Sequence, residues 1–190
     1  MNIFDTIQQK LKKMFSGEDY ESGAQFLQWV HKNLRKTHCF TCESNHKRIF
    51  ENNQDKPPIG TQNHPYCECY YDDIEQKPVG SISNKGILSP DVYLKAYGKL
   101  LDYYITKEEA MTLGWSQGKN LAHFAPGKMI GGDVFKNNPS KLPQKDGRIW
   151  YECDVDYVEG GRRNCSRLYY SNDGLMFYTD HFNDKVYQIL

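Results

Sequence analysis

The sequence lacks an excess of charge of either sign and has little apolar material. Lys plus Arg and Asp plus Glu each number 24 in 190 residues, so the formal net charge is zero. This balance argues against an unstructured basic tail, although a local basic cleft can lie within a neutral chain. Hydrophobic residues make up only 38%, and no apolar run approaches the ~18 residues that a membrane span needs. We therefore expect no membrane span.

We also expect no secretory signal peptide. The N-terminal stretch MNIFDTIQQKLKKMF has neither a continuous apolar run nor a small-residue cleavage site. Its apolar residues recur at helical spacing, which predicts an amphipathic helix docked on its own protein; they are Ile3, Phe4, Ile7, Leu11, Met14 and Phe15. Three lysines (Lys10, Lys12 and Lys13) leave a membrane-surface or partner-binding helix as the alternative. We expect the chain to be cytoplasmic on synthesis, with any delivery by a route that uses no signal peptide.

The chain divides by character into residues 1–85 and residues 86–190. In the first region, the stretch 21–36 (ESGAQFLQWVHKNLRK) carries an apolar stripe that predicts a second helix. Residues 70–86 (YYDDIEQKPVGSISNKG) have the Pro, Gly and Ser content of a linker. The first region is thus expected to be a small helical, cysteine-rich domain followed by a linker.

Two helix starts open the second region. Ser89 is suited to cap a helix whose first residue is Pro90. Thr106, with Glu109 three residues later, forms the sequence signature of a capping box.

Three strand-like runs follow, at residues 148–157, 166–172 and 175–180. Gly160 and Gly161 separate the first two runs, and an Asn-Asp-Gly turn separates the second and third. Helices followed by an antiparallel sheet predict an α+β fold.

The first of these runs, RIWYECDVDY, places acidic residues on the same face as a tryptophan. Side chains alternate along a strand, so Trp150, Glu152 and Asp154 share one face. Cys153 points the other way, toward the expected core. The acidic face is either a solvated surface or the floor of an active site.

Other residues of this region favour the active site, because an antiparallel sheet can bring them to that face. Glu152 and His181 are a carboxylate and an imidazole, and the cations are Lys107, Arg163 and Arg167. A base, an acid and fixed cations are the groups needed to transfer a phosphodiester without a metal. A solvated ladder of ion pairs is the alternative.

Longer motifs in this region resemble the barnase family of bacterial ribonucleases over about residues 89–190. In order along the chain they are YITKEEAMTLGW, NLAHFAPGKMIGGDVFKN, KLPQKDGRIWYECDVDY, RNCSRLYYS and YTDH. The resemblance implies N-terminal helices packed on a twisted antiparallel sheet. It also implies cleavage of single-stranded RNA through a 2′,3′-cyclic phosphate, with no cofactor for catalysis.

The resemblance also implies a role for each matching residue. Glu152 would be the general base and His181 the general acid. Lys107, Arg163 and Arg167 would bind phosphate, and Asp154 would orient the arginines. Counting forward from Glu152 would choose Arg162 in place of Arg163. The remaining expected substrate-binding residues are Phe135, Asn137 and Phe182.

Two departures from the family pattern concern base recognition. The family's loop continues after GGDxFxN with an arginine and a glutamate, where this chain has Asn138 and Pro139. Since the glutamate reads the guanine edge, the resemblance implies a weaker preference for guanine here. Phe182 replaces the family's tyrosine after the histidine, which keeps a stacking surface but loses a hydroxyl.

Four of the six cysteines lie in the first region, in two close pairs. Cys39 and Cys42 form Cys-x2-Cys, and Cys67 and Cys69 form Cys-x-Cys. Four thiolates in two pairs can make a closed tetrahedral zinc site, with His64 as a substitute ligand. Two disulfides or free thiols are the alternatives. The remaining pair, Cys153 and Cys165, is expected to be two separate thiols.

Residues 25–72 resemble a segment of phage minor head proteins, in a Trp-bearing helix, Cys-x2-Cys and the later His-Pro-x-Cys-x-Cys. Fusion of such a segment to a nuclease resembles the layout of bacterial polymorphic toxins. A toxin would need a dedicated inhibitor, expected to resemble barstar. The rival interpretations are a non-catalytic RNA-binding module and a phage structural protein with a ribonuclease passenger domain.

Overall fold

The structure is a computed structural model that describes residues 25–31, 39–52, 55–59, 62–83, 85, 88–138, 140–156, 165–180 and 185–190. Contacts within the chain define a large unit, Gln76–Phe135 with Ile149–Leu190, and a small unit, Gly23–Glu75 with Lys136–Arg148. The boundary expected between residues 85 and 86 stays a prediction. The helix expected over residues 3–15 lies outside the described residues. Among the described residues, no helix has the length and apolar character needed to cross a membrane.

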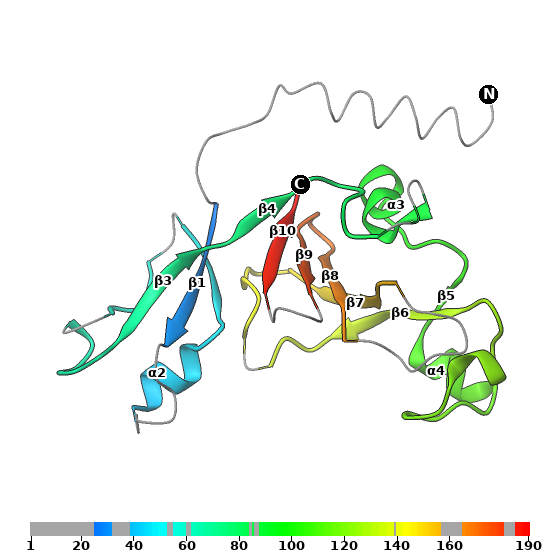
Figure 1. Cartoon of the computed structure of the whole chain (residues 1–190), viewed down its shortest axis with the longest axis horizontal. Coiled ribbons are helices and arrows are strands. Elements are labelled where there is room, and N and C mark those ends of the chain that lie inside the picture. Colours follow the sequence, from blue (N-terminus) through cyan, green and yellow to red (C-terminus); the bar gives the residue numbers. More distant parts are fainter. Residues whose placement is uncertain are drawn as a thin grey trace. The chain divides into compact units, whose positions relative to one another are not determined.

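The large unit is built on a seven-stranded sheet in the order β4-β10-β9-β8-β7-β6-β5 (Figure 1). Pairing from β6 through to β10 is antiparallel, whereas β5 runs parallel to β6. The three predicted runs are confirmed as β7, β8 and β9. The strands are β4 Glu75–Lys77, β5 Tyr104–Ile105, β6 Met129–Phe135, β7 Trp150–Asp154, β8 Arg167–Ser171, β9 Met176–Thr179 and β10 Val186–Ile189.

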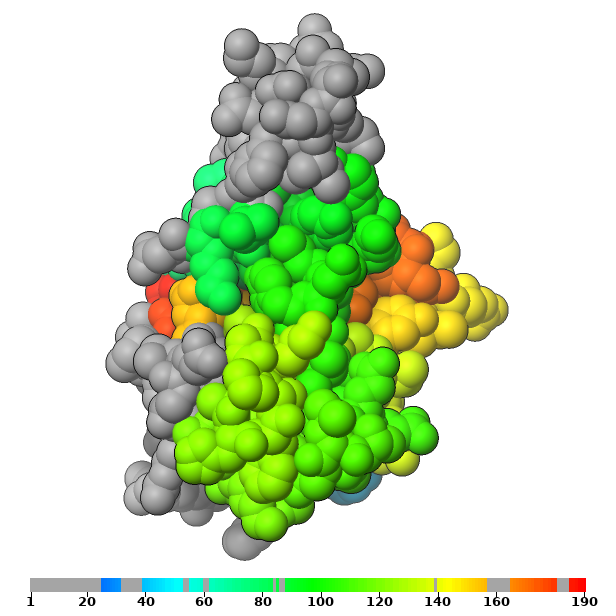
Figure 2. Space-filling model, turned by 90° about the vertical axis from the view of Figure 1, so that its right-hand side faces the viewer, coloured from blue at the N-terminus to red at the C-terminus, as the bar shows by residue number. Residues whose placement is uncertain are grey.

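Helices α3 (Pro90–Tyr97) and α4 (Lys107–Thr112) precede most of this sheet in the chain, so the predicted α+β class is confirmed. In Figure 2 the green segments that contain them adjoin one another on the face shown. Helix α3 ends at Gly98, whose φ of 68° is favourable for glycine. Ser89 occupies the N-cap position, but its hydroxyl donates to the Asp91 carboxylate instead of capping the helix.

The main core lies on one face of the large sheet. Val92 and Leu94 of α3 pack there against alternate residues of the strands, among them Cys153 and Leu168. Because side chains alternate, Trp150, Glu152 and Asp154 lie on the opposite face, as predicted. A second core cluster joins α4 to β6 through Ala110 and Ile130, with the short 3-10 helix Leu121–His123 alongside.

The small unit contains a three-stranded sheet in the order β2-β1-β3, and this corrects the helical prediction. Strand β1 (Phe26–His31) occupies part of the stretch 21–36 that was expected to be a helix. Strands β2 (Ile49–Glu51) and β3 (Cys69–Asp73) flank it, both antiparallel to it. The described helix of this unit is the six-residue α2 (Phe40–Asn45). The predicted linker 70–86 is also wrong in its first half, since β3 and β4 occupy most of residues 69–77.

The helix was predicted from an apolar stripe of Phe26, Leu27, Val30 and Leu34, but β1 buries Phe26 and Trp29 and leaves Leu27 and Val30 half-buried. The backbone of β1 pairs along both edges. Aromatic residues favour strands when partner strands are available, and tertiary pairing overrides a weak local preference.

Candidate active site

The capping box of α4 holds Lys107 at the start of the helix. The Thr106 side chain accepts a hydrogen bond from the Glu109 backbone N–H, and the Glu109 carboxylate accepts one from the Thr106 backbone N–H at 2.7 Å. The Thr106 backbone bond most of all, and then a bond from the Thr106 hydroxyl at 3.0 Å, lower the pKa of the Glu109 carboxyl. The predicted capping box is confirmed, and it fixes the direction in which the Lys107 side chain leaves the helix.

Lys107 makes an ion pair with Glu152 in the middle of β7. The Glu152 side chain is 16% exposed and that of Lys107 is 37% exposed, so both ends of the pair are reachable from solvent. The structure therefore brings together two of the predicted site residues that lie far apart in the sequence.

Asp133 belongs to this group, although the sequence analysis did not single it out. Its two carboxylate oxygens accept hydrogen bonds from the backbone N–H of Lys107 at 3.0 and 3.1 Å. Its Cα is paired in register with Glu152 across β6 and β7. A carboxylate at the first turn satisfies an unpaired helix N–H group. The motif GGDVF offered a signal, because Asp133 directly follows two glycines, of which Gly131 allows the close approach of β6 to β7.

Asp154 and Arg167 form a second pair on the same face. Arg167 Nε lies 3.2 Å from Asp154 Oδ1, and the Asp154 side chain is 1% exposed. The two residues are directly opposite in the β7–β8 register. Arg167 also donates to the Ser166 carbonyl at 2.7 Å. This geometry agrees with the predicted orienting contact between Asp154 and an arginine.

An aromatic pair lies beside Glu152. The rings of Phe135 and Tyr169 are 4.7 Å apart, and Tyr169 is opposite Glu152 in the β7–β8 register. Burial, and then the negative charge of Glu152, raise the pKa of Tyr169. Phe135 is thus close in the sheet to the predicted base, and its role in substrate binding stays a prediction.

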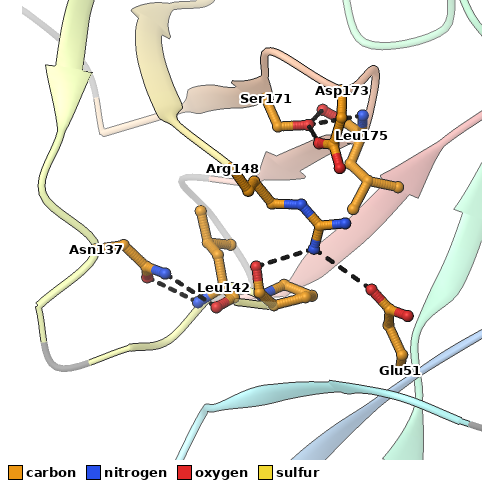
Figure 3. Close-up of polar contacts among 8 residues, drawn as sticks. Glu51, Asn137, Leu142, Arg148, Ser171, Asp173 and Leu175 are labelled. Carbon is orange, nitrogen blue, oxygen red and sulfur yellow. Dashed lines mark hydrogen bonds and ion pairs between the residues drawn. The ribbon is translucent and has the colours of Figure 1, made fainter. Parts of the chain in front are cut away.

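Asn137 was expected to bind substrate, and its side chain is engaged with its own loop. Its amide nitrogen donates to the Leu142 carbonyl at 2.9 Å, and its oxygen accepts from the Leu142 N–H at 2.8 Å (Figure 3). The residue is 4% exposed. These contacts suit a residue that shapes the loop, and its role toward substrate stays a prediction.

Four of the residues considered for the site lie outside the described part of the chain: Arg162, Arg163, His181 and Phe182. Their predicted roles are neither supported nor contradicted by the geometry.

A cavity of about 740 Å³ opens on the other face of the large sheet. Tyr151 and Tyr170 line it, and both alternate with residues of the acidic face. The cavity therefore does not include Glu152, and the candidate site is the acidic face instead.

The predicted metal ligands of the small unit converge around Cys42. Its Sγ lies 3.8 Å from Cys67 Sγ and 3.1 Å from His64 Nε2. The donor atoms of Cys39, Cys42 and His64 all lie within 4.8 Å of one another, and so do those of His31, Cys42 and Cys69. His31, which lies opposite Cys69 in the β1–β3 register, was not predicted as a ligand. The structure contains no disulfide among the six cysteines, all of which it describes, and Cys153 and Cys165 are separate residues, as expected.

Acidities differ among these thiols. Burial raises the pKa of Cys67, but hydrogen bonds from the Cys69 backbone and Asn63 outweigh this effect and lower the pKa to about 7. Burial raises the pKa of Cys42, and its thiol neighbours raise it further. Sulfur and imidazole donors at such distances form a set suited to zinc.

Residues 90–188, which include most of the large unit, are similar to known proteins. A sequence model of a family described as ribonuclease matches residues 90–188. A ribonuclease of Heyndrickxia coagulans is 53% identical over 92 residues, which are 47% of this chain and 84% of that protein. Ribonucleases of Bacillus intermedius and Bacillus pumilus are each 53% identical over 92 residues, which span 56% of their lengths.

The chain therefore belongs to the ribonuclease family, and the predicted enzyme class, an endoribonuclease, is confirmed. The match begins at residue 90, so it does not bear on the predicted resemblance of residues 25–72 to phage minor head proteins.

Proposed function

We propose that the acidic face of the large sheet cleaves single-stranded RNA through a 2′,3′-cyclic phosphate without a catalytic metal. The observation that carries this proposal is the Lys107–Glu152 ion pair, which places a carboxylate beside a cation. A carboxylate in that position can accept a proton while the ammonium stabilises charge on the phosphate.

The proposed first step is transesterification. Glu152 takes the proton of the ribose 2′-hydroxyl, and the 2′-oxygen attacks phosphorus. The bond to the 5′-oxygen breaks, and His181 gives that oxygen its proton. A cyclic phosphate and a free 5′-hydroxyl result.

The other site residues bind and orient. Lys107, Arg163 and Arg167 hold the charge that develops on the phosphate oxygens. Asp154 fixes the Arg167 guanidinium, since the two are in contact at 3.2 Å. Phe135 and Phe182 offer aromatic surfaces to bases.

Base selection is proposed to be relaxed. Asn138 is exposed and stands, with Pro139, where the family pattern has an arginine and a glutamate. Neither residue offers a carboxylate to the guanine edge. Strict cleavage after guanine in a panel of dinucleotides would contradict this proposal.

The small unit is proposed to hold one structural zinc ion. Cys39, Cys42, Cys67 and Cys69 would bind it, with His64 as the substitute. The His64 Nδ1 atom lies 2.8 Å from the Pro65 carbonyl, which only accepts hydrogen bonds, so the neutral ring carries its proton there. Its Nε2 lone pair then faces Cys42 Sγ at 3.1 Å, where both atoms could bind one metal. Trp29 gives further support, because its buried Nε1 interacts with the Cys69 sulfur and opposes the rise that burial causes in the pKa of that thiol, and a Cys69 thiolate would be the better acceptor.

The biological role is proposed to be that of a toxin with a dedicated inhibitor. An active ribonuclease endangers the RNA of the cell that makes it. The support is the joining of a cysteine-rich unit to a ribonuclease domain and the cations of the active face. The inhibitor would present carboxylates in place of RNA phosphates.

Incubation of purified protein with single-stranded RNA and EDTA tests the catalytic proposal. Products ending in 2′,3′-cyclic phosphate are expected, and a Glu152→Gln variant should not form them. A requirement for added metal, or products with other ends, would overturn the mechanism.

A further inference from the structure

The segment Lys136–Arg148 belongs to the ribonuclease match by sequence but to the small unit by its contacts. It joins β6 to β7, the strands that carry Asp133 and Glu152. The chain on both sides of it is part of the large unit. The segment is therefore the place where the cysteine-rich unit can act on the ribonuclease domain through the chain itself.

Lys141 anchors the middle of this segment to the turn between α2 and β2. The Ile49 backbone N–H donates to the Lys141 carbonyl at 2.7 Å. The Lys141 ammonium donates in return to the His46 carbonyl. Lys141 is thus held by one hydrogen bond through its backbone carbonyl and a second through its side chain.

Arg148 anchors the end of the segment to β2. Its guanidinium donates to Glu51 Oε1 at 3.3 Å and to the Pro143 carbonyl at 3.1 Å (Figure 3). The Arg148 side chain is only 4% exposed, so solvent screens this ion pair weakly. The segment is braced internally as well, by the paired bonds between Asn137 and Leu142.

The anchoring turn is itself fixed to the cysteine cluster. The His46 N–H donates to the Cys42 carbonyl at 3.1 Å, which ties the turn to the helix that carries a central thiol. On its other side, Trp29 of β1 donates to the Arg48 carbonyl and accepts from the Lys47 N–H. A continuous series of hydrogen bonds therefore connects the cysteine cluster, the turn at His46 and the segment 136–148.

From these contacts we infer that the cysteine-rich unit is a positioning element for residues 136–148 and so a determinant of RNA binding by the ribonuclease. This inference rests on the proposed function, in which Asn138 and Pro139 of this segment stand where the family pattern has its base-recognition residues. A loop that is ordered before the substrate arrives loses less conformational entropy on binding, so the affinity for RNA rises. Glu51 and Lys141 are positioning residues in this scheme.

Glu51→Gln tests the inference from outside the ribonuclease match. We expect faster hydrogen exchange at the backbone amides of Ile49 and Leu142, and a KM for RNA raised on the order of five- to tenfold with kcat unchanged. Glu51→Asp, which keeps the charge, should restore most of the affinity. The matched control is Asp72→Asn on β3, where an exposed carboxylate is removed from the same unit.

A second pair of variants tests the same inference in case Glu51→Gln does not fold. Lys141→Met removes a lysine-to-carbonyl bond that holds the segment, whereas Lys56→Met removes a similar bond to the Asn52 carbonyl within the small unit. Lys141→Met should raise KM, and Lys56→Met should not.

Unchanged exchange at Ile49 and Leu142 in both test variants would overturn the inference. So would a fall in kcat at constant KM, or faster exchange spread over the whole chain. If the intact protein cleaves no RNA, the proposed function is refuted, whereas the exchange measurement still decides whether the small unit holds the segment.

Discussion

Lys107, in the first turn of α4, makes an ion pair with Glu152, in the middle of β7. The backbone N–H of the same lysine is held by Asp133 of β6. One residue thus connects a helix start to two adjacent strands and places a cation beside the carboxylate that is the predicted general base.

Removal of the proposed base should abolish most catalysis without unfolding the protein. Glu152→Ala is expected to lower kcat by about 10²- to 10⁴-fold, because proton transfer contributes that much, and His181→Ala should do likewise. The exposed Glu108→Gln on α4 is the control and should cleave normally. Full cleavage by Glu152→Ala, measured on a fluorescent oligonucleotide, would remove Glu152 from the mechanism.

The capping box predicts a pH dependence of stability. The pKa of Glu109 is lower in the folded protein than its ordinary value of 4.5, chiefly because of the Thr106 backbone bond. Its contribution to folding is therefore fully present above that ordinary value and is lost as the pH falls through the folded pKa.

Urea unfolding over about pH 3 to 7 measures this effect. The unfolding free energy of the wild-type protein should fall more steeply in acid than that of Glu109→Gln. Glu108→Gln should follow the wild-type curve, and parallel curves for all three proteins would contradict the prediction.

The close approach of β6 to β7 depends on Gly131. A Cβ at this position would lie 2.5 Å from the Cys153 Cβ and 2.6 Å from a Tyr104 ring carbon. Since such contacts force the strands apart, Gly131→Ala should destabilise the protein by about 1–3 kcal/mol. It should also lower kcat, because Asp133 and Glu152 lie beside this contact on the same two strands. An unchanged melting temperature would show that the strands can separate there freely.

The cysteine cluster should bind about one zinc ion per chain, at Zn–S distances of roughly 2.3 Å. Elemental analysis and X-ray absorption measure both quantities. Cys42→Ser should lose the metal because Cys42 is central to the cluster, whereas Cys165→Ser, at an exposed thiol elsewhere, should keep it.

Chelation should loosen the described part of residues 1–85 and leave the ribonuclease domain folded. The absence of metal together with two disulfides by mass spectrometry would decide for the alternative.

A dedicated inhibitor should compete with RNA for the same cations. Arg167→Glu is expected to weaken both RNA cleavage and inhibitor binding, and association should slow as salt concentration rises. The competition can be measured with the protein and its co-purifying partner. A partner that bound only residues 1–85 and left cleavage intact would refute the idea.

Local signals in the sequence were sufficient where neighbouring residues decide the structure. The capping box at Thr106 and Glu109 was found because its partners are three residues apart. Strands β7, β8 and β9 were found because each run is separated from the next by a turn sequence. The pairing of Asp154 with an arginine followed from the resemblance, and the β7–β8 register explains it, since Arg167 is directly opposite.

The remaining features depend on partners far away in the chain, and only the tertiary structure decided them. The run Phe26–His31 is too short for its spacing to distinguish a helix from a strand, and it became β1 because Ile49–Glu51 and Cys69–Asp73 supply partners on both edges. The approach of His31 to Cys42 and Cys69 followed from that register. The sequence by itself determined the ribonuclease family and the identity of its candidate catalytic residues. The assignment of residues 136–148 to the small unit came from hydrogen bonds between residues more than ninety positions apart, which no local pattern encodes.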